Sequence, residues 1–317
     1  MMLKNDISVV VPVYNEYENL PELYKRVKNT VSSITDKYQI IFVNDGSNDD
    51  SLSRILSFAE NNPKVFYLDL SRNFGHQIAV TAGLEYCNAD CTVIIDSDLQ
   101  DPPELIFELY SKYREGFDVV YAKRKKREGD TFIKKFTAKL YYRLLKRWVS
   151  FEIPLDAGDY RLISNKVVSA VNQMPEQNKF LRAQIAWLGL KQAYVLFDRE
   201  IRKHGKSGYS YGKMFRLAFD GITGFSDKPL LLVSRLGFVI SIFSFLVIIY
   251  AIFAHYIFKQ TITGWTSLII SAMFMGGIQL LSIGIIGEYI SRINKNVQKR
   301  PLYILKDTNI NDTYINS

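Results

Sequence analysis

The sequence predicts an α/β protein in which a domain with a mostly parallel central sheet is followed by two C-terminal transmembrane helices. Three observations lead to this prediction. Short β-branched apolar runs alternate with helical patterns over roughly the first 120 residues. Polar residues follow four of these runs. Two long stretches near the C-terminus contain no Asp, Glu, Lys or Arg.

Strand and helix patterns follow one another in a regular order. Apolar runs predict strands at residues 7–15, 38–47, 65–71, 92–96 and 117–124. Helical patterns lie between them, from about Glu18 to Ile34, near Ser51 to Glu60, after the glycine loop at 72–75, and after Pro102 and Pro103. This order is typical of a doubly wound sheet with helices on both faces.

Polar side chains gather where the predicted strands end. In strand order they are Tyr14, Asn15 and Glu16; Asn44 and Asp45; Arg72, Asn73 and Gly75; and Asp96 and Asp98. Ligands of open α/β sheets bind beyond the carboxyl ends of the strands, so these residues predict a nucleotide site. The sequence contains no G-x-G-x-x-G, which argues against a dinucleotide fold. The GKS at residues 205–207 has Glu200 where a Walker loop needs its first glycine.

Two carboxylates stand one residue apart at the end of the fourth predicted strand. The run from Thr92 to Ile95 is apolar without alternation, so Asp96 falls at its carboxyl end. Asp96 and Asp98 can both reach one hard cation, and such a cation commonly binds phosphates as well. The alternative, a solvated acidic turn, requires no second carboxylate so close to the first, because like charges repel. We therefore expect a divalent cation here.

The two uncharged stretches predict membrane spans. Residues 236–258 and 260–287, of 23 and 28 residues, can each cross a bilayer of roughly 30 Å. Basic residues flank the outer ends of this pair, and only Lys259 lies between the spans. By the positive-inside rule both termini are cytoplasmic. The predicted organisation is a cytoplasmic domain at 1–227, two spans with a short outer loop at 228–290, and a basic cytoplasmic tail at 291–317.

The net charge of +8 could face nucleic acid, anionic lipid or a phosphorylated substrate. The two spans favour the lipid and the phosphorylated substrate, and we expect no nucleic-acid partner. Residues 132–149 combine helical apolar spacing with six Lys and Arg, which predicts either an interfacial helix or an ordinary helix packed on the domain. Residues 211–225 are the stronger candidate for an interfacial helix. We expect Cys87 and Cys91 to be reduced and to be ordinary core or surface residues, not metal ligands.

Several segments together resemble a known family. They are VPVYNE, VNDGSNDDS, RNFGHQIAVTAGL, DSDLQDPP and DAGDYRLI, then RKHGKSGYSYGK, and IGEYISRINKNVQKRPLYI after the spans. This ordered set resembles glycosyltransferase family 2, and most closely the bacterial polyprenyl-phosphate glycosyltransferases related to dolichol-phosphate mannose synthase. The resemblance extends to about residue 304. It implies a catalytic domain of GT-A type.

The resemblance also implies roles for individual residues. The nucleotide-sugar would be contacted by Pro12, Tyr14, Glu16, Asp45, Asn73, Gly75 and Asp96. Mg²⁺ or Mn²⁺ would be held by Asp96, Asp98 and Gln100 and would neutralise the departing diphosphate. Asp159 matches the position usually called the catalytic base. We expect Asp156 and Gly158 to share a loop with it.

The implied acceptor, undecaprenyl phosphate, changes what Asp159 must do. A lipid monophosphate has a second pKa near 6 and arrives largely ionised, so strong general base catalysis is unnecessary. Asp159 either takes a proton or orients the acceptor and the metal. Cationic and hydroxyl side chains would hold the acceptor phosphate, and the candidates are Arg124, Arg127, Arg161, Arg202 and Ser207. For the run at 123–127, a solvated lipid-facing surface is an equal alternative.

Two rival functions follow from the same fold. A processive polysaccharide synthase would carry a QxxRW element after Asp159, but the only RW pair, Arg147 and Trp148, precedes it. A non-catalytic membrane scaffold would not need the intact acids. We expect UDP-glucose or UDP-N-acetylglucosamine as donor, then UDP-galactose or GDP-mannose. A homo-oligomer, a separate flippase and a downstream glycosyltransferase are the expected partners.

Overall fold

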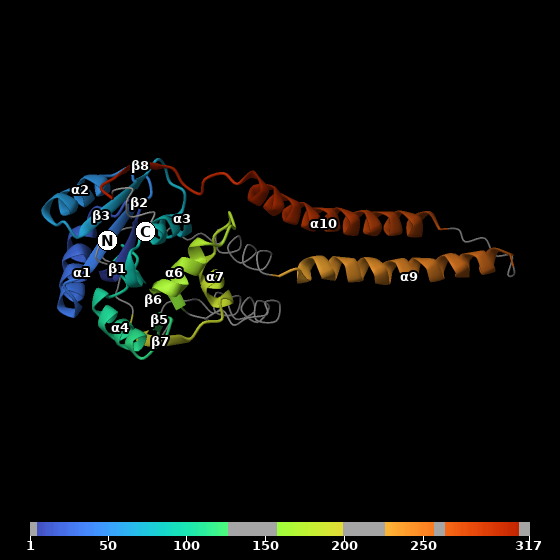
Figure 1. Ribbon diagram of the computed structural model, residues 1–317. Helices are drawn as coiled ribbons and strands as arrows, with labels where there is room; N and C mark the ends of the chain where they lie inside the picture. Colours follow the sequence, from blue (N-terminus) through green and yellow to red (C-terminus); the bar gives the residue numbers. More distant parts are fainter. Residues whose placement is uncertain (1–4, 126–156, 199–225, 257–263, 311–317) are drawn as a thin grey trace. The chain divides into compact units, whose positions relative to one another are not determined.

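A computed structural model describes residues 5–125, 157–198, 226–256 and 264–310. The chain divides into two compact units, residues 1–215 with 300–317, and residues 216–299 (Figure 1). The predicted interfacial stretches 132–149 and 211–225 both lie outside the described residues.

The first unit is built on a mixed sheet, ordered β7-β5-β6-β4-β1-β2-β3-β8 in the described residues. Its strands are β1 (Asn5–Val13), β2 (Tyr38–Asn44), β3 (Val65–Leu70), β4 (Ala89–Ile94), β5 (Val119–Arg124), β6 (Ala157–Ser164), β7 (Gln192–Phe197) and β8 (Leu305–Thr308). The pairs of β1 with β2 and β4, β2 with β3, and β5 with β7 are parallel. The predicted mostly parallel α/β sheet is confirmed.

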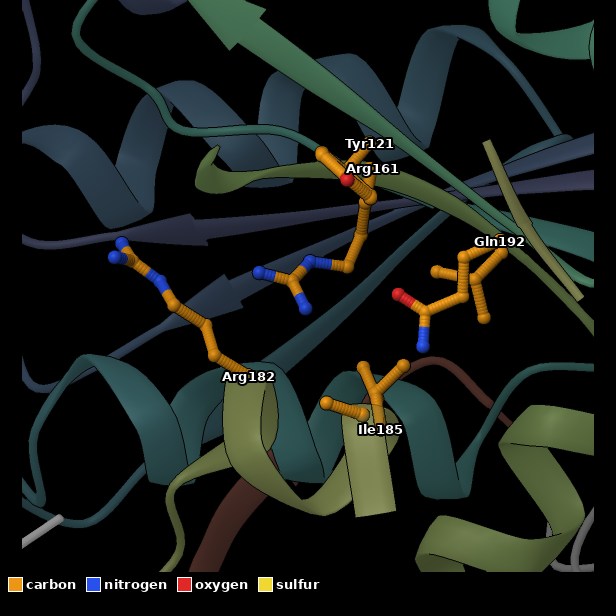
Figure 2. Close-up of a pocket in the computed structure, with 7 residues that line it drawn as sticks. Tyr121, Arg161, Arg182, Ile185 and Gln192 are labelled. Atoms are coloured by element: carbon orange, nitrogen blue, oxygen red, sulfur yellow. The ribbon is translucent and has the colours of Figure 1, made fainter. Parts of the chain in front are cut away.

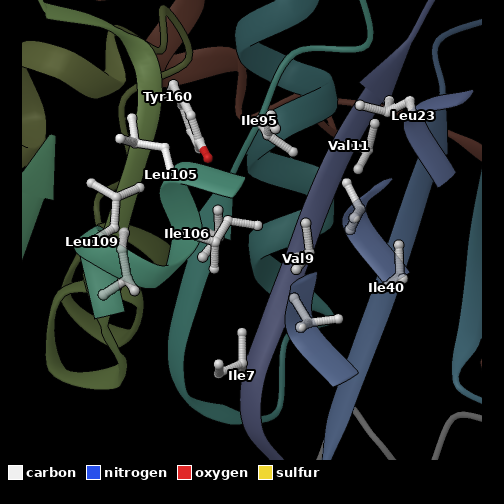
Figure 3. Close-up of a cluster of buried hydrophobic side chains, with 14 of the residues drawn as sticks. Ile7, Val9, Val11, Leu23, Ile40, Ile95, Leu105, Ile106, Leu109 and Tyr160 are labelled. Carbon is white, nitrogen blue, oxygen red and sulfur yellow. The ribbon is translucent and has the colours of Figure 1, made fainter. Parts of the chain in front are cut away.

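Helices cover both faces of this sheet (Figure 1). They are α1 (Leu20–Ile34), α2 (Ser51–Asn61), α3 (His76–Glu85), η1 (Pro103–Leu105), α4 (Ile106–Arg114), α6 (Asn165–Asn172) and α7 (Leu181–Trp187). Alternate residues of β1 enter different cores: Val9 and Val11 pack with α1, α2 and α4, whereas Val10 packs with α3, α6 and α7. Figure 3 shows the first of these cores. Burial on both faces explains why the strands read as continuous apolar runs.

Strand β6 runs antiparallel between β4 and β5, and its direction decides where Asp159 lies. Ile94 of β4 pairs with Arg161 of β6. Continuing that register by two residues brings Asp159 opposite Asp96, at the edge where β4 ends. The expectation that Gly158 and Asp159 lie in a loop was wrong, because both residues belong to the start of this strand.

The chain returns to the sheet after its long C-terminal helices. Strand β8 pairs antiparallel with β3, and Ile310 beyond it is buried in the core. Side chains secure the strand, because the Tyr67 hydroxyl donates to Asp307 at 2.8 Å and the Asn309 amide donates to the Val65 carbonyl at 3.1 Å. Part of the predicted basic tail is therefore an edge strand.

The second unit contains α9 (Lys228–Tyr256) and α10 (Trp265–Gln298). Both are long and apolar enough to cross a membrane, over Lys228–Val247 and Ser271–Gln298, and neither window is buried. The Tyr289 hydroxyl donates to the Ser226 carbonyl at 2.7 Å. Because Ser226 precedes α9 and Tyr289 lies in the second half of α10, the two helices form an antiparallel hairpin.

Candidate active site

Asp96 and Asp98 lie in a tight turn directly after β4. Leu99 within this turn has φ of +58° and is 2% exposed, so its side chain anchors the turn in the core. The Gln100 backbone N–H donates to Asp98 Oδ1 at 3.1 Å. Asp96 and Asp98 are only partly buried, so the turn presents both carboxylates at the end of the strand.

His76 joins the Asp96 turn to Asp159. It is the first residue of α3 and follows Gly75, whose φ of +102° favours glycine. His76 Nε2 lies 2.8 Å from Asp96 Oδ1, and its Nδ1 lies 3.8 Å from Asp159 Oδ2. Burial lowers the pKa of His76, but the charges of Asp96 and Asp159 outweigh it and raise this pKa to about 9. The ring is therefore protonated at neutral pH.

Asp159 is surrounded by cationic groups. Arg182 Nε donates to its Oδ1 at 2.9 Å, and an Arg161 terminal nitrogen lies 3.5 Å from the same oxygen. Figure 2 shows both arginines entering the space between the sheet and α7, Arg161 from the sheet and Arg182 from the helix. Burial raises the pKa of Asp159, but Arg182, His76 and Arg161 together hold it well below its usual range. Such a carboxylate is a weak base.

Asp45 anchors the glycine loop that precedes α3. Its two carboxylate oxygens accept the backbone N–H groups of Phe74 and Gly75, at 2.7 and 2.9 Å. Burial raises the pKa of Asp45, although these bonds oppose the shift. A Cβ on Gly46 would meet the Arg72 backbone at 2.4 Å, so only glycine permits this approach of the two loops. Asn73 lies exposed in the same loop.

The loop after β1 is tied to the loop after β2. The backbone N–H groups of Asn15 and Glu16 donate to the hydroxyls of Ser47 and Ser51, each at 3.0 Å. Tyr14 is 43% exposed, whereas Pro12 is buried within β1. The predicted nucleotide-contacting residues therefore lie around the carboxyl ends of the neighbouring strands β4, β1, β2 and β3.

The predicted acceptor-binding residues divide into two groups. Arg124 ends β5, and one of its terminal nitrogens lies 3.6 Å from where a Cβ on Gly158 would stand. Arg161 has a 6% exposed side chain and donates to the backbone carbonyls of Gly158 and Asp159, at 2.9 and 3.2 Å. Burial lowers the pKa of Arg161 to about 10, so it remains charged. Arg127, Arg202 and Ser207 lie outside the described residues.

Sequence reasoning missed three residues of this site: His76, Gln77 and Arg182. His76 and Gln77 belong to the motif RNFGHQIAVTAGL, and their position just after a glycine loop at a strand end was a usable signal. Arg182 had no comparable signal, because it lies 23 residues beyond Asp159 in a helix and reaches the site only through tertiary packing.

Comparison with known proteins agrees with this arrangement. The sequence profile of Glycosyl transferase family 2 matches residues 8–171, which span β1 to α6 and include Asp45, Asp96 and Asp159. The chain belongs to glycosyl transferase family 2. The resemblance inferred from the motifs is thereby confirmed.

Full-length relatives in this family are also similar. The chain is 46% identical to the uncharacterized glycosyltransferase YkcC of Bacillus subtilis, over 94% of this chain and 93% of that protein. It is 39% identical to the SfII prophage-derived bactoprenol glucosyl transferase of Shigella flexneri, over 95% and 97% of the two chains. A crystal structure of glucosyl-3-phosphoglycerate synthase from Mycobacterium tuberculosis matches 74% of this chain and 80% of that one, with 20% identity and a TM-score of 0.47. At that level of similarity no residue role is carried over.

Proposed function

We propose that this family 2 protein transfers one sugar from a nucleotide-sugar to a polyprenyl phosphate, such as undecaprenyl phosphate, with inversion at the anomeric carbon. The proposal depends chiefly on one observation: Asp96 and Asp159 lie near each other at the carboxyl end of β4, where His76 contacts both carboxylates. Similarity to a bactoprenol glucosyl transferase over 95% of the chain supports a polyprenyl-phosphate acceptor, and with it UDP-glucose as the first donor to test.

The residues at the end of β4 fit a divalent cation that is shared with the substrate. Among the described residues, no group of three or more His, Cys, Asp and Glu side chains could hold a metal by itself. Mg²⁺ is commonly bound by one or two carboxylates together with substrate phosphates. Asp96 and Asp98, helped by Gln100, would hold Mg²⁺ or Mn²⁺. When bound, the cation would stabilise the charge that grows on the leaving nucleoside diphosphate.

Asp159 acts in this proposal chiefly by orienting the acceptor. Its low pKa makes it a poor proton acceptor, and the phosphate nucleophile is already ionised. One phosphate oxygen attacks the anomeric carbon as the bond to the diphosphate breaks, which inverts that carbon in a single displacement. Positioning the two reactants can supply a large part of the rate enhancement.

Cations near Asp159 would bind the acceptor phosphate. Arg124 ends a strand at this edge of the sheet, so we assign it to the phosphate itself. Arg161 is nearly buried and bonded to the backbone, which favours a supporting role beneath Asp159. Arg127, Arg202 and Ser207 remain proposed phosphate ligands.

We further propose that the reaction takes place at the cytoplasmic face of the membrane. The hairpin of α9 and α10 supports two spans, and the return of β8 to the sheet supports having the catalytic domain and the C-terminus on one side. A product made there would require a separate flippase and a glycosyltransferase on the far side. A homo-oligomer is part of the same proposal.

The test is transfer of radiolabelled sugar from a panel of UDP and GDP donors to undecaprenyl phosphate by purified protein in detergent. We expect label in the lipid phase from one donor, and loss of that label with EDTA and in Asp98→Ala. The matched control is Asp118→Ala, because Asp118 accepts a hydrogen bond from the Ser164 hydroxyl at the other end of the strands, away from Asp96 and Asp159. Label in a polymer would instead support a polysaccharide synthase. Metal-dependent nucleotide binding without any transfer would support a scaffold.

A further inference from the structure

Arg182 is held in place by a contact that links three elements. Gln77 on α3 accepts the backbone N–H of Leu181 at 3.1 Å, and its amide nitrogen lies 3.4 Å from Asp159 Oδ2. Leu181 is the first residue of α7 and directly precedes Arg182. One glutamine side chain therefore fastens the start of α7 beside the carboxylate that Arg182 binds.

The Asp159 carboxylate needs a cationic partner because it is ionised and nearly buried. The Asp159 side chain is 13% exposed, and the same histidine that contacts it also contacts Asp96. An ionised, nearly buried carboxylate without a cationic partner is strongly unfavourable. The proposed reaction also brings an anionic phosphate to this place. Arg182 supplies both a charge and a directed N–H donor to Asp159 Oδ1.

We propose that Arg182 is a positioning residue for sugar transfer, which acts by fixing the orientation of the Asp159 carboxylate, and that Gln77 fixes Arg182 in turn. This inference rests on the proposed function. In this arrangement Gln77 of α3, Asp159 of β6 and Arg182 of α7 lie together, and the direction of the carboxylate depends on all three elements. Errors of about 1 Å in the placement of reacting groups can reduce rates about 100-fold.

The kinetic test compares substitutions at Arg182 with a matched arginine. Arg182→Gln should lower kcat about 100-fold and leave the donor KM within about twofold, because Arg182 acts on orientation and not on nucleotide binding. Arg182→Lys, which retains the charge, should recover about tenfold of that loss. Gln77→Ala should lower kcat about tenfold. The control is Arg26→Gln on α1, which breaks an ion pair with Glu104 and should leave kcat unchanged. The Arg26 side chain is 20% exposed and that of Arg182 29%, although Glu104 is more exposed than Asp159.

A double-mutant cycle with Asp159→Asn then tests whether Arg182 acts through Asp159. If it does, adding Arg182→Gln to Asp159→Asn should lower kcat less than about threefold further. The melting temperature gives a second readout that needs no turnover: Arg182→Gln should lower it, and Asp159→Asn in the same chain should restore part of the loss. Full additivity in both measurements would overturn the inference. A wild-type protein that transfers no sugar would instead overturn the proposed function, and the melting cycle would still decide whether Arg182 and Asp159 are coupled.

Discussion

Asp159 remains ionised over the whole range in which an enzyme of this kind works. Burial alone raises its pKa, but Arg182, His76 and Arg161 hold it well below the usual value. A depressed pKa in the folded state gives stability that is present above the unfolded value of about 4 and lost as the pH falls through the folded value. Asp159 therefore contributes no pH dependence to stability or activity above about pH 5.

The acid limb of the rate profile should consequently belong to the acceptor. We expect kcat/KM to fall below about pH 6 as the lipid monophosphate takes up its second proton. A polyprenyl phosphonate, whose second pKa is higher, should shift the limb upward. The measurement is the pH–rate profile with both acceptors, at saturating metal and donor. A limb at the same pH for both acceptors would assign it to the protein.

Asp45 should be sensitive to the loss of a single oxygen. In Asp45→Asn one of the backbone donors, Phe74 or Gly75, would face an amide NH₂ group, which leaves a partly buried donor unsatisfied at a cost of about 1–3 kcal/mol. We expect UDP binding to weaken about tenfold or more, because 1.4 kcal/mol corresponds to a factor of ten. Titration calorimetry with UDP and Mn²⁺ measures this effect. Asp118→Asn is the control, and equal affinities in the two variants would contradict the anchoring role.

Among the elements, β8 covers the edge strand of the sheet beside the proposed nucleotide site. It covers β3, whose Asp69 is buried and accepts the Asn44 amide at 2.7 Å at the end of β2. Lys306 of β8 lies 3.7 Å from Asp69. An uncovered edge strand would expose unpaired backbone groups and invite aggregation.

Truncation should reveal this contribution. A chain ending at Lys299 loses β8 and also Ile310, whose burial alone is worth about 1.5–3 kcal/mol. We expect a clear drop in the melting temperature and more aggregation in detergent. A chain ending at Ile310 is the matched control, because it keeps the strand and its buried isoleucine. Identical thermal unfolding of the two truncated chains would refute the structural role of β8.

At the level of the whole molecule, the hairpin and the returning strand predict a membrane topology. A cysteine at Lys259 should react with a membrane-impermeant maleimide added to intact cells, and a cysteine at Ser317 only after the membrane is opened. The native thiols should give little background, because burial raises the pKa of Cys87 to about 12 and that of Cys91 as well. Labelling of both introduced cysteines from outside would contradict the topology.

Local sequence patterns were sufficient to predict much of the secondary structure and several acidic residues of the candidate site. The runs that became β1 to β5, the carboxylates Asp96 and Asp98, and the two long apolar helices each depend on neighbours close in sequence. Periodicity and charge report such features directly, because they arise from burial of a face or transfer into lipid. The ordered motifs were likewise enough to identify the family.

Only the tertiary structure revealed four features of this protein. Strand β6 inserts antiparallel between β4 and β5, and His76 contacts two carboxylates that are distant in sequence. Gln77 and Arg182 both contact Asp159, and β8 returns to pair with β3. Each joins segments between 20 and about 240 residues apart. Strand register and helix placement over such distances are decided by packing of the whole core, which no local pattern encodes. The amino-acid sequence by itself thus determined the type of domain and its acidic residues, and the packed sheet decided which of those acids meet and which cations hold them.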